Sequence, residues 1–337
     1  MPDHAPALLT ATETLLLRHP AISAQHLAFV YAGDLWIADT DGRNPRRLTA
    51  SSGYTVAPAF SPDGQFLAYS SSGSGSMSVY VVPVAGGRPR RLTFHPGDDL
   101  VRGWTPDGRV LFASSRASMN GRVQQLYTLA PDAGHPEALP LPMADRGAFA
   151  ADGRRVAYTP FGEPWWSWKR YRGGMTVPIW ILDLGSLEQH LVPHENATDS
   201  FPCWLGSKLY FLSDRLGTVN VFEYDGSSGT VTPITQHDDF DVRSLSAGPD
   251  RLVYEQGGRL HLLRPGVDGG RALSLSLAAD RPATQVRQVP AADFITTCGL
   301  SPTGVRAIFA ARGEVSRIET NQIVRKAIGI EMIAGEE

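Results

Sequence analysis

Serine, histidine and aspartate recur in groups that would suit catalysis or metal binding if the fold brought them together. Ser70–Ser78 is rich in serine, His190 and His194 are four residues apart, and Asp238–Asp241 is acidic. A catalytic serine needs a positioned base and oxyanion donors, and no Gly-x-Ser-x-Gly motif occurs. Because serine and glycine favour turns, we interpret Ser70–Ser78 as a hairpin loop.

The histidine pair and the acidic cluster both have a metal-binding alternative. Histidines four apart can share a metal on a helix, but this stretch is typical of a strand entering a loop, where they would be more than about 13 Å apart. Asp238, Asp239 and Asp241 lack the central glycine and the terminal glutamate of an EF-hand loop. We therefore expect no metal site, no cofactor and no catalytic residue.

These residues belong to a repeating pattern. The turns Pro62–Gly64, Pro106–Gly108 and Ala151–Gly153 follow one another at spacings of 44 and 45 residues, and Arg-Arg-Leu-Thr ends at both Thr49 and Thr93. A period in the low forties, built from short β-type runs and glycine-containing turns, is typical of propeller blades. A single blade cannot bury both of its faces, so the blades are expected to close into a ring.

The sequence predicts an all-β fold, a six-bladed β-propeller with an incomplete extra repeat at the C-terminus. The six units begin near His19, Ala57, Val101, Gly147, Phe201 and Val242. The predicted domains are an N-terminal extension at 1–18, the propeller at 19–277, a linker at 278–298, and an incomplete further blade with an irregular tail at 299–337.

Composition narrows the range of partners. The formal net charge is −3, which argues against nucleic acid. Only three of the 31 basic residues are lysines, and arginine favours bidentate pairing with carboxylates. The chain shows neither a secretory signal nor an apolar run of about 18 residues, and Cys203 and Cys298 have no paired spacing. We expect a cytoplasmic protein that does not bind membranes.

Two groups of residues are candidate interaction sites. Loops that lead from one blade to the next surround one mouth of the central channel, where charged residues either guide peptide termini or are simply solvated. These channel-mouth candidates are Asp98, Asp99, Arg102, Asp145, Arg146, Asp199, Asp238, Asp239, Asp241 and Arg243.

The second group lies in an insertion within the fourth unit and combines aromatic with cationic side chains. Its members are Trp165, Trp166, Trp168, Lys169, Arg170, Tyr171 and Arg172. Aromatic residues and arginine are enriched at interfaces, so we favour a contact with another domain or subunit. A loop that covers its own blade and a ligand site are the alternatives.

Four motifs carry a resemblance to a known family: Gly33–Trp36, Trp168–Gly174 in register within the atypical fourth unit, Tyr210–Arg215 and Asp238–Val242. The repeats resemble TolB-like propellers in general. More closely, residues 19–315 resemble the N-terminal six-bladed propeller of tricorn protease, a large archaeal and bacterial serine peptidase assembly.

The resemblance implies a non-catalytic module that guides or gates peptides, with peptides and the protease domains or sister subunits of a tricorn-like assembly as partners. In that family a seven-bladed propeller, a PDZ-like domain and catalytic domains follow, and their catalytic residues have no counterpart here. The family's dibasic anchor for the substrate carboxylate is not carried over, because loop 94–101 contains Asp98 and Asp99, with only Arg102 nearby.

Two other functions remain open from the residues alone. One is a freestanding TolB-like scaffold that binds another protein. The other is a propeller with its own active site, as in some sugar lyases and hydrolases, which would need a convergent set of ligands or carboxylates that we do not find.

Overall fold

The computed structural model describes residues 13–50, 53–132, 134–162, 168–279, 290, 292–311 and 314–319. The chain divides into two units, Met1–Ala279 and Asp280–Glu337. The first unit is a ring of six sheets, each made of four strands in sequence order. The predicted all-β six-bladed propeller is therefore confirmed.

Every blade is an antiparallel meander whose first strand is innermost. The strands of blades 1 to 3 are β1 (Arg18–Ile22), β2 (His26–Tyr31), β3 (Asp34–Asp39), β4 (Arg46–Arg47), β5 (Thr55–Phe60), β6 (Phe66–Ser71), β7 (Ser78–Pro83), β8 (Arg90–Arg91), β9 (Asp99–Trp104), β10 (Val110–Ser114), β11 (Gln125–Leu129) and β12 (Glu137–Ala138). The strands of blades 4 to 6 are β13 (Arg146–Phe149), β14 (Arg155–Thr159), β15 (Trp180–Asp183), β16 (Gln189–Leu191), β17 (Asp199–Leu205), β18 (Lys208–Ser213), β19 (Asn220–Asp225), β20 (Thr230–Pro233), β21 (Val242–Ala247), β22 (Leu252–Gln256), β23 (Arg259–Leu263) and β24 (Arg271–Ala272).

The Pro-Asp-Gly turns link the first and second strands, as the sequence predicts. In the turn after β5, Gly64 has a φ of 71° and its N–H donates to the Ser61 carbonyl at 2.8 Å. The Ser61 hydroxyl donates to Asp63 Oδ1 at 2.6 Å and accepts the N–H of Phe66 at 2.9 Å. The short side chains thus hold a turn that only glycine enters without strain at this φ.

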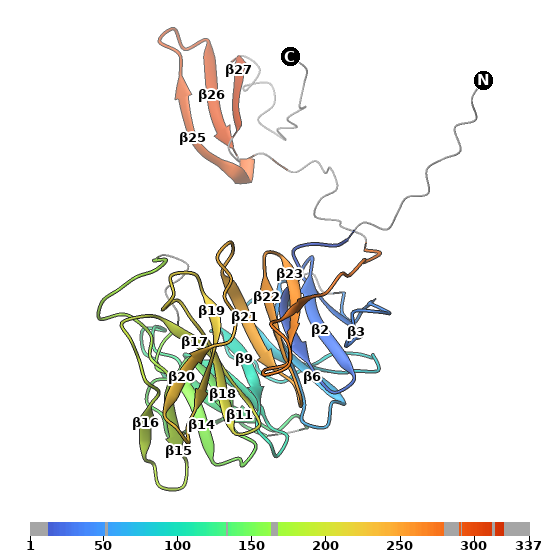
Figure 1. Cartoon of the computed structure of the whole chain (residues 1–337). Coiled ribbons are helices and arrows are strands. Elements are labelled where there is room, and N and C mark those ends of the chain that lie inside the picture. Colours follow the sequence, from blue (N-terminus) through green and yellow to red (C-terminus); the bar gives the residue numbers. More distant parts are fainter. Residues whose placement is uncertain are drawn as a thin grey trace, which may run out of the picture. The chain divides into compact units, whose positions relative to one another are not determined.

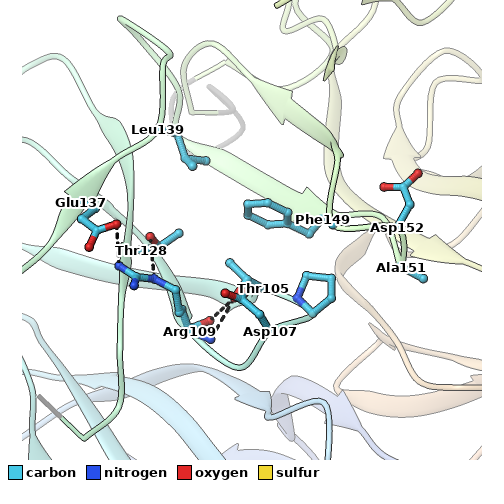
Figure 2. Close-up of a pocket in the computed structure, with 11 residues that line it drawn as sticks. Thr105, Asp107, Arg109, Thr128, Glu137, Leu139, Phe149, Ala151 and Asp152 are labelled. Atoms are coloured by element: carbon cyan, nitrogen blue, oxygen red, sulfur yellow. Dashed lines mark hydrogen bonds and ion pairs between the residues drawn. The ribbon is translucent and has the colours of Figure 1, made fainter. Parts of the chain in front are cut away.

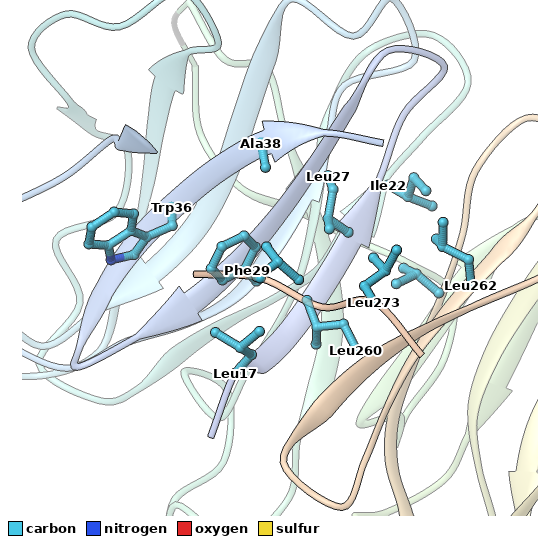
Figure 3. Close-up of a cluster of buried hydrophobic side chains, with 11 residues drawn as sticks. Leu17, Ile22, Leu27, Phe29, Trp36, Ala38, Leu260, Leu262 and Leu273 are labelled. Carbon is cyan, nitrogen blue, oxygen red and sulfur yellow. The ribbon is translucent and has the colours of Figure 1, made fainter. Parts of the chain in front are cut away.

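The core consists of six apolar clusters, each shared by two adjacent blades. Figure 3 shows the cluster in which Phe29 and Trp36 of blade 1 meet Leu260 and Leu262 of blade 6. The alternating and fully apolar strands fit this arrangement because both faces of a blade are covered by its neighbours. In Figure 1 the first blade, in blue, and the last, in orange, lie side by side.

Among the strands that the structure describes, none is exchanged between blade 6 and blade 1. Closure rests on the shared core and on hydrogen bonds, in which the Thr14 N–H donates to the Leu275 carbonyl at 2.7 Å and the Leu277 N–H to Thr14 Oγ1 at 2.9 Å. Glu13 also pairs with Arg259 at 2.7 Å. Part of the segment expected to be an N-terminal extension thus binds the last blade.

The second unit contains a short 3-10 helix, η3 (Ala292–Phe294), and one antiparallel sheet of β25 (Ile295–Leu300), β26 (Arg306–Ala311) and β27 (Glu314–Glu319). Three described strands fit the predicted incomplete repeat. Within this unit Leu300 is 72% exposed. β25 begins at Ile295, four residues before the expected start of this blade.

Candidate functional site

The central channel is lined by the innermost strands, and five of these six strands contain a β-bulge. The register shift leaves extra residues at His19-Pro20, Ala57-Pro58, Arg102, Phe201-Pro202 and Arg243. β13, the sixth inner strand, pairs without a shift and begins at Arg146. Bulges turn side chains out of the regular strand pattern and are common near functional sites.

Three of these bulges hold a left-handed backbone directly before a proline. The φ angles of His19, Ala57 and Phe201 are 49°, 53° and 52°. Each such conformation costs on the order of 1–3 kcal/mol in a residue other than glycine. Strain repeated in three blades points to a function for the inner strands, and it marks the channel as our candidate site.

Four arginines gather around His19. Arg18 precedes it on β1, while Arg102, Arg146 and Arg243 come from β9, β13 and β21, and the positive charge of each acts on the imidazole. Burial of the imidazole lowers the pKa of His19 most, and the four positive charges lower it further, to about 4. β13 belongs to the blade opposite β1, so the charge of Arg146 acts on His19 from the far side of the ring of blades.

Arg102 and Arg18 each bind a carboxylate of another blade. Arg102 donates from Nε to the Asp145 carbonyl at 2.7 Å and from Nη2 to Asp145 Oδ1 at 2.8 Å, which links blades 3 and 4. Arg18 Nε lies 2.8 Å from Glu255 Oε1. Glu255 Oε2 also accepts the His19 N–H and the Ser244 hydroxyl, each at 3.2 Å. These two carboxylates are nearly buried and fix the geometry of the constriction.

A third arginine stacks on an aromatic ring. The guanidinium carbon of Arg146 lies 3.5 Å from the centre of the Phe201 ring on the neighbouring blade. Such cation–π contacts stabilise the pair and hold the guanidinium plane against the ring. We name the set Arg18, His19, Arg102, Arg146, Phe201 and Arg243 the arginine ring.

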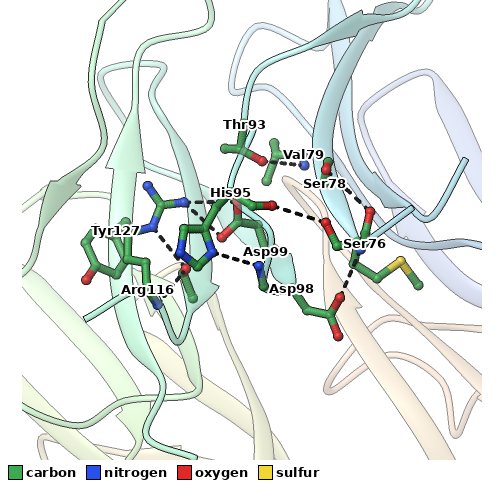
Figure 4. Close-up of polar contacts among 12 residues, drawn as sticks. Ser76, Ser78, Val79, Thr93, His95, Asp98, Asp99, Arg116 and Tyr127 are labelled. Carbon is green, nitrogen blue, oxygen red and sulfur yellow. Dashed lines mark hydrogen bonds and ion pairs between the residues drawn. The ribbon is translucent and has the colours of Figure 1, made fainter. Parts of the chain in front are cut away.

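Other predicted channel-mouth residues bind within the protein. Asp99, fully buried, accepts two hydrogen bonds from Arg116, whose guanidinium lies over the Tyr127 and Phe112 rings (Figure 4). In blade 5, Arg215 donates one hydrogen bond to Asp199 Oδ2 at 2.8 Å. Both carboxylates anchor a strand to the loop between the second and third strands.

Three of the remaining acidic candidates, Asp98, Asp239 and Asp241, bind backbone or side-chain groups in loops. Asp98 Oδ1 accepts the N–H of Met77 at 2.9 Å, and Asp239 Oδ1 accepts the Gln256 amide at 2.7 Å. Asp241 Oδ1 accepts the Val219 N–H at 3.0 Å and its Oδ2 pairs with Lys169 at 2.6 Å. No cluster of three or more potential metal ligands occurs in the described part of the chain.

The aromatic insertion is held to blades 5 and 6 by its cations. In addition to the Lys169–Asp241 pair, Arg170 Nε donates to the Gly217 carbonyl at 3.0 Å, and Arg172 binds Asp214 through Oδ2 and the carbonyl oxygen at 3.0 and 2.7 Å. The ring centres of Trp168 and Tyr171 lie 5.5 Å apart with their planes tilted by 33°, and Trp168 is 53% exposed. Trp165 and Trp166 lie outside the described residues.

An arrangement of a hydroxyl, an imidazole and a carboxylate occurs beside this insertion. His194 Nδ1 is 3.0 Å from Asp199 Oδ2, and its Nε2 is 3.4 Å from Thr176 Oγ1. Thr176 Oγ1 already donates to the Gly173 carbonyl at 3.0 Å, and Asp199 is bound to Arg215. The set is structural, because the His194 side chain, 17% exposed, is held between Thr176 and Asp199.

Two open clefts lie between neighbouring blades, away from the arginine ring. One of them has a volume of about 580 Å³ and lies between the turns of blades 3 and 4 (Figure 2). There Arg109 pairs with Glu137 at 3.0 Å and donates to Thr128 at 3.2 Å, while Asp152 pairs with Arg155. Because these charged side chains are paired with one another, the cleft holds no set of groups converging on a ligand.

Our sequence reasoning included Arg102, Arg146 and Arg243 but missed Arg18, His19, Phe201 and Glu255. A signal for two of them was present. Proline inside a strand is confined to edges and bulges, and His19-Pro20, Ala57-Pro58 and Phe201-Pro202 all fall within inner strands. Glu255 comes from the second strand of blade 6, and no repeat pattern identifies it.

Comparison with known proteins supports the family resemblance. Residues 14–268 match the model of the tricorn protease N-terminal beta propeller domain. Tricorn protease homolog 2 of Streptomyces coelicolor is 34% identical, with 89% of this chain and 26% of the relative covered, and tricorn protease homolog 1 of the same organism is 32% identical, with 89% and 28% covered. This chain thus spans about a quarter of the length of these relatives.

Solved structures show the same fold. The crystal structure of the tricorn protease superimposes with a TM-score of 0.78 at 23% identity and covers 90% of this chain and 30% of that one. A TolB structure from Agrobacterium tumefaciens gives 0.52 at 21% identity, with 65% and 80% covered. Within the described residues, no helix is long and apolar enough to cross a membrane.

Proposed function

The chain belongs to the family of tricorn protease N-terminal propeller domains, and from this we propose that it is a non-catalytic module that guides peptides through its central channel toward protease domains or sister subunits. The observation that carries the proposal is the arginine ring, because the inner strands of the blades bring charged and aromatic side chains together inside the channel. Guanidinium groups and an aromatic ring are suited to contact a passing peptide.

The chemistry of the described residues supports a role without catalysis. A hydrolase of the serine type needs a nucleophile, a base and oxyanion donors in one place. The Thr176–His194–Asp199 arrangement lacks a hydroxyl that is free to attack, because Thr176 donates to the Gly173 carbonyl. We further propose a cytoplasmic location, which the free thiols of Cys203 and Cys298 support since disulfides are rare there.

A plug in the channel tests the proposal. We would introduce a thiol by Arg243→Cys in a Cys298→Ser background and attach a bulky maleimide after folding. Cys203 should not react, because burial raises the pKa of its thiol. The control is the wild-type chain labelled at Cys298, which lies in the second unit.

Binding of an uncharged fluorescent peptide is then measured by anisotropy. We expect the plug to weaken binding at least tenfold and the Cys298 label to leave it unchanged. Equal binding by both labelled proteins would place the peptide outside the channel and refute the proposal. Sequencing the gene beyond codon 337 adds a second test, since protease-like sequence in the same frame supports a role in proteolysis and a stop codon favours the freestanding scaffold.

A further inference from the structure

Three large apolar side chains are exposed on loops of blades 4, 5 and 6 at one end of the propeller. Trp168 belongs to the aromatic insertion between β14 and β15, Leu216 to the loop between β18 and β19, and Phe240 to the loop between β20 and β21. Their exposed fractions are 53%, 56% and 62%. In an antiparallel meander, the loops that follow the second and the fourth strand emerge at the same end. Single exposed apolar residues are ordinary, so the question is whether these three lie together.

The aromatic insertion is held against the loop that contains Phe240. Lys169 follows Trp168 directly, and its Nζ lies 2.6 Å from Asp241 Oδ2. Asp241 in turn follows Phe240. Because consecutive Cα atoms are only about 3.8 Å apart, this ion pair keeps Trp168 and Phe240 on the same part of the surface.

The same insertion is bound to the loop that contains Leu216. Arg170 Nε donates to the carbonyl of Gly217 at 3.0 Å. The loops of blades 5 and 6 are also joined to each other, because Asp241 Oδ1 accepts the Val219 N–H at 3.0 Å. Contacts thus connect all three loops in pairs. We name Trp168, Leu216 and Phe240 the apolar patch; exposed apolar side chains that gather in this way mark interaction sites.

The charges beside the apolar patch have opposite signs at two of its members. Arg170 is exposed, and it forms no ion pair with a carboxylate of the described residues, so it contributes a positive charge beside Leu216. Asp238 and Asp239 directly precede Phe240 and are exposed. Neither of them pairs with a lysine or arginine that the structure describes, so they contribute negative charge beside Phe240.

Such a surface is complementary to a second copy of itself. In a two-fold dimer the same patch of both copies forms the interface, and each residue meets the rotated counterpart of its partner. Two apolar patches placed in this way bury their apolar side chains against each other, and Arg170 of one copy faces Asp238 and Asp239 of the other. Burial of apolar area then supplies affinity, while the opposite charges fix the orientation.

A second copy fits these charges better than a partner of one sign. An acidic or a basic partner would be attracted to one side of the apolar patch and repelled by the other. The affinity should be low, because a large aromatic side chain buries only about 150–250 Å² and a standard interface needs roughly 800 Å² per partner.

We propose that the apolar patch is a self-association surface, through which two copies of this chain form a weak two-fold dimer. The proposal goes beyond peptide guidance and does not depend on it, since neither the channel nor a peptide takes part. It also gives the exposed ring of Trp168 a partner, although the cations of the insertion bind within the protein.

Sedimentation velocity of the full chain tests the apolar part of the proposal. A reducing buffer keeps Cys298 from linking two copies, and concentrations up to about 500 µM reach the range of weak interfaces. We expect wild type to dimerise and Phe240→Ser to raise the dissociation constant about tenfold. The matched control is Phe94→Ser in a loop of blade 2, where the ring is 74% exposed, and it should leave the dissociation constant unchanged.

A charge swap tests the orientation. Arg170→Glu and Asp238→Arg should each weaken self-association about fivefold, because each variant sets like charges against each other at both symmetry-related contacts. An equimolar mixture of the two variants should associate nearly as tightly as wild type, since the opposite charges meet again. Damage to the fold of either variant cannot produce this recovery. Arg88→Glu, on an exposed turn between β7 and β8, is the control and should have no effect.

Three results would overturn the proposal. The first is a wild-type chain that stays monomeric at the highest concentration. The second is a dimer that Phe240→Ser leaves intact, which would place the interface elsewhere, for example on the second unit. The third is a mixture of the charge variants that associates no better than either variant alone. None of these results bears on peptide binding in the channel, so the proposed function stands or falls separately.

Discussion

The titration of His19 provides a quantitative test of the arginine ring. Burial and then the charges of Arg18, Arg146, Arg243 and Arg102 lower the pKa of this imidazole from 6.5 to about 4, so it stays neutral in the folded protein above that pH. In the unfolded chain it takes up a proton below about pH 6.5. The unfolded state therefore binds more protons between pH 6.5 and 4, and stability falls as the pH is lowered through this window.

The size of the effect follows from the shift. A change of one pKa unit is worth about 1.4 kcal/mol, so the 2.5 units between 6.5 and about 4 correspond to a loss of up to ~3 kcal/mol, complete below pH 4. The variant His19→Asn removes the titrating group and keeps a side chain that tolerates the left-handed backbone at this position, where φ is 49°. The difference between variant and wild type should therefore shrink or reverse in favour of the variant as the pH falls.

Urea unfolding at several pH values between 4 and 7 measures this difference. Other titrating groups contribute equally to both proteins, so they cancel. We expect wild type to lose about 3 kcal/mol more than the variant from pH 7 to pH 4. Parallel pH profiles would mean that His19 titrates normally, and the account of a positively charged constriction would be wrong.

Three further predictions concern other parts of the molecule. The purified chain should hydrolyse no fluorogenic peptide, and turnover that survives repurification and is blocked by a serine-directed inhibitor would contradict this. Truncation after Leu277 should shift the thermal midpoint by only a few degrees, which corresponds to about 1 kcal/mol of stability, because the closing contacts to Thr14 end at this residue. Loss of the folded state would show that the later residues complete the ring. Trp168→Ala should change the free energy of unfolding in urea by no more than about 1 kcal/mol, since the side chain is 53% exposed. If the insertion is an interface, the variant should show weaker self-association or docking in sedimentation. A large loss of stability with unchanged association would identify a lid over the blade.

Much of the fold was predictable because each repeat is marked by residues close together in the sequence, a turn followed by an apolar strand. Asp-Gly turns at Asp63, Asp107 and Asp152 set the first hairpin of three blades, and apolar strands follow each of them. Six such units can bury their faces only against each other, so the closed ring follows from counting them. The incomplete repeat at the C-terminus was visible for the same reason.

The site was less accessible because its contacts join residues that are far apart in the sequence. Arg18 and His19 contact Glu255 of the last blade, which is 236 residues from His19 in the sequence, and Arg102 contacts Asp145 of the next blade. The charge of an acidic residue did not reveal its role, since Asp99 binds Arg116 inside a blade whereas Asp145 binds Arg102 at the channel. Only the ring geometry shows which charged residues share the channel.

Mapping where a peptide touches the protein tests the central claim most directly. A blocked peptide with a benzophenone side chain is photo-crosslinked to the unmodified chain, and the attachment sites are identified by mass spectrometry. The account predicts crosslinks on the inner strands around the arginine ring, on or near β1, β9, β13 and β21, that a tenfold excess of unlabelled peptide suppresses. Suppressible crosslinks confined to the outer strands or to the clefts between blades would contradict the claim that the channel is the peptide site.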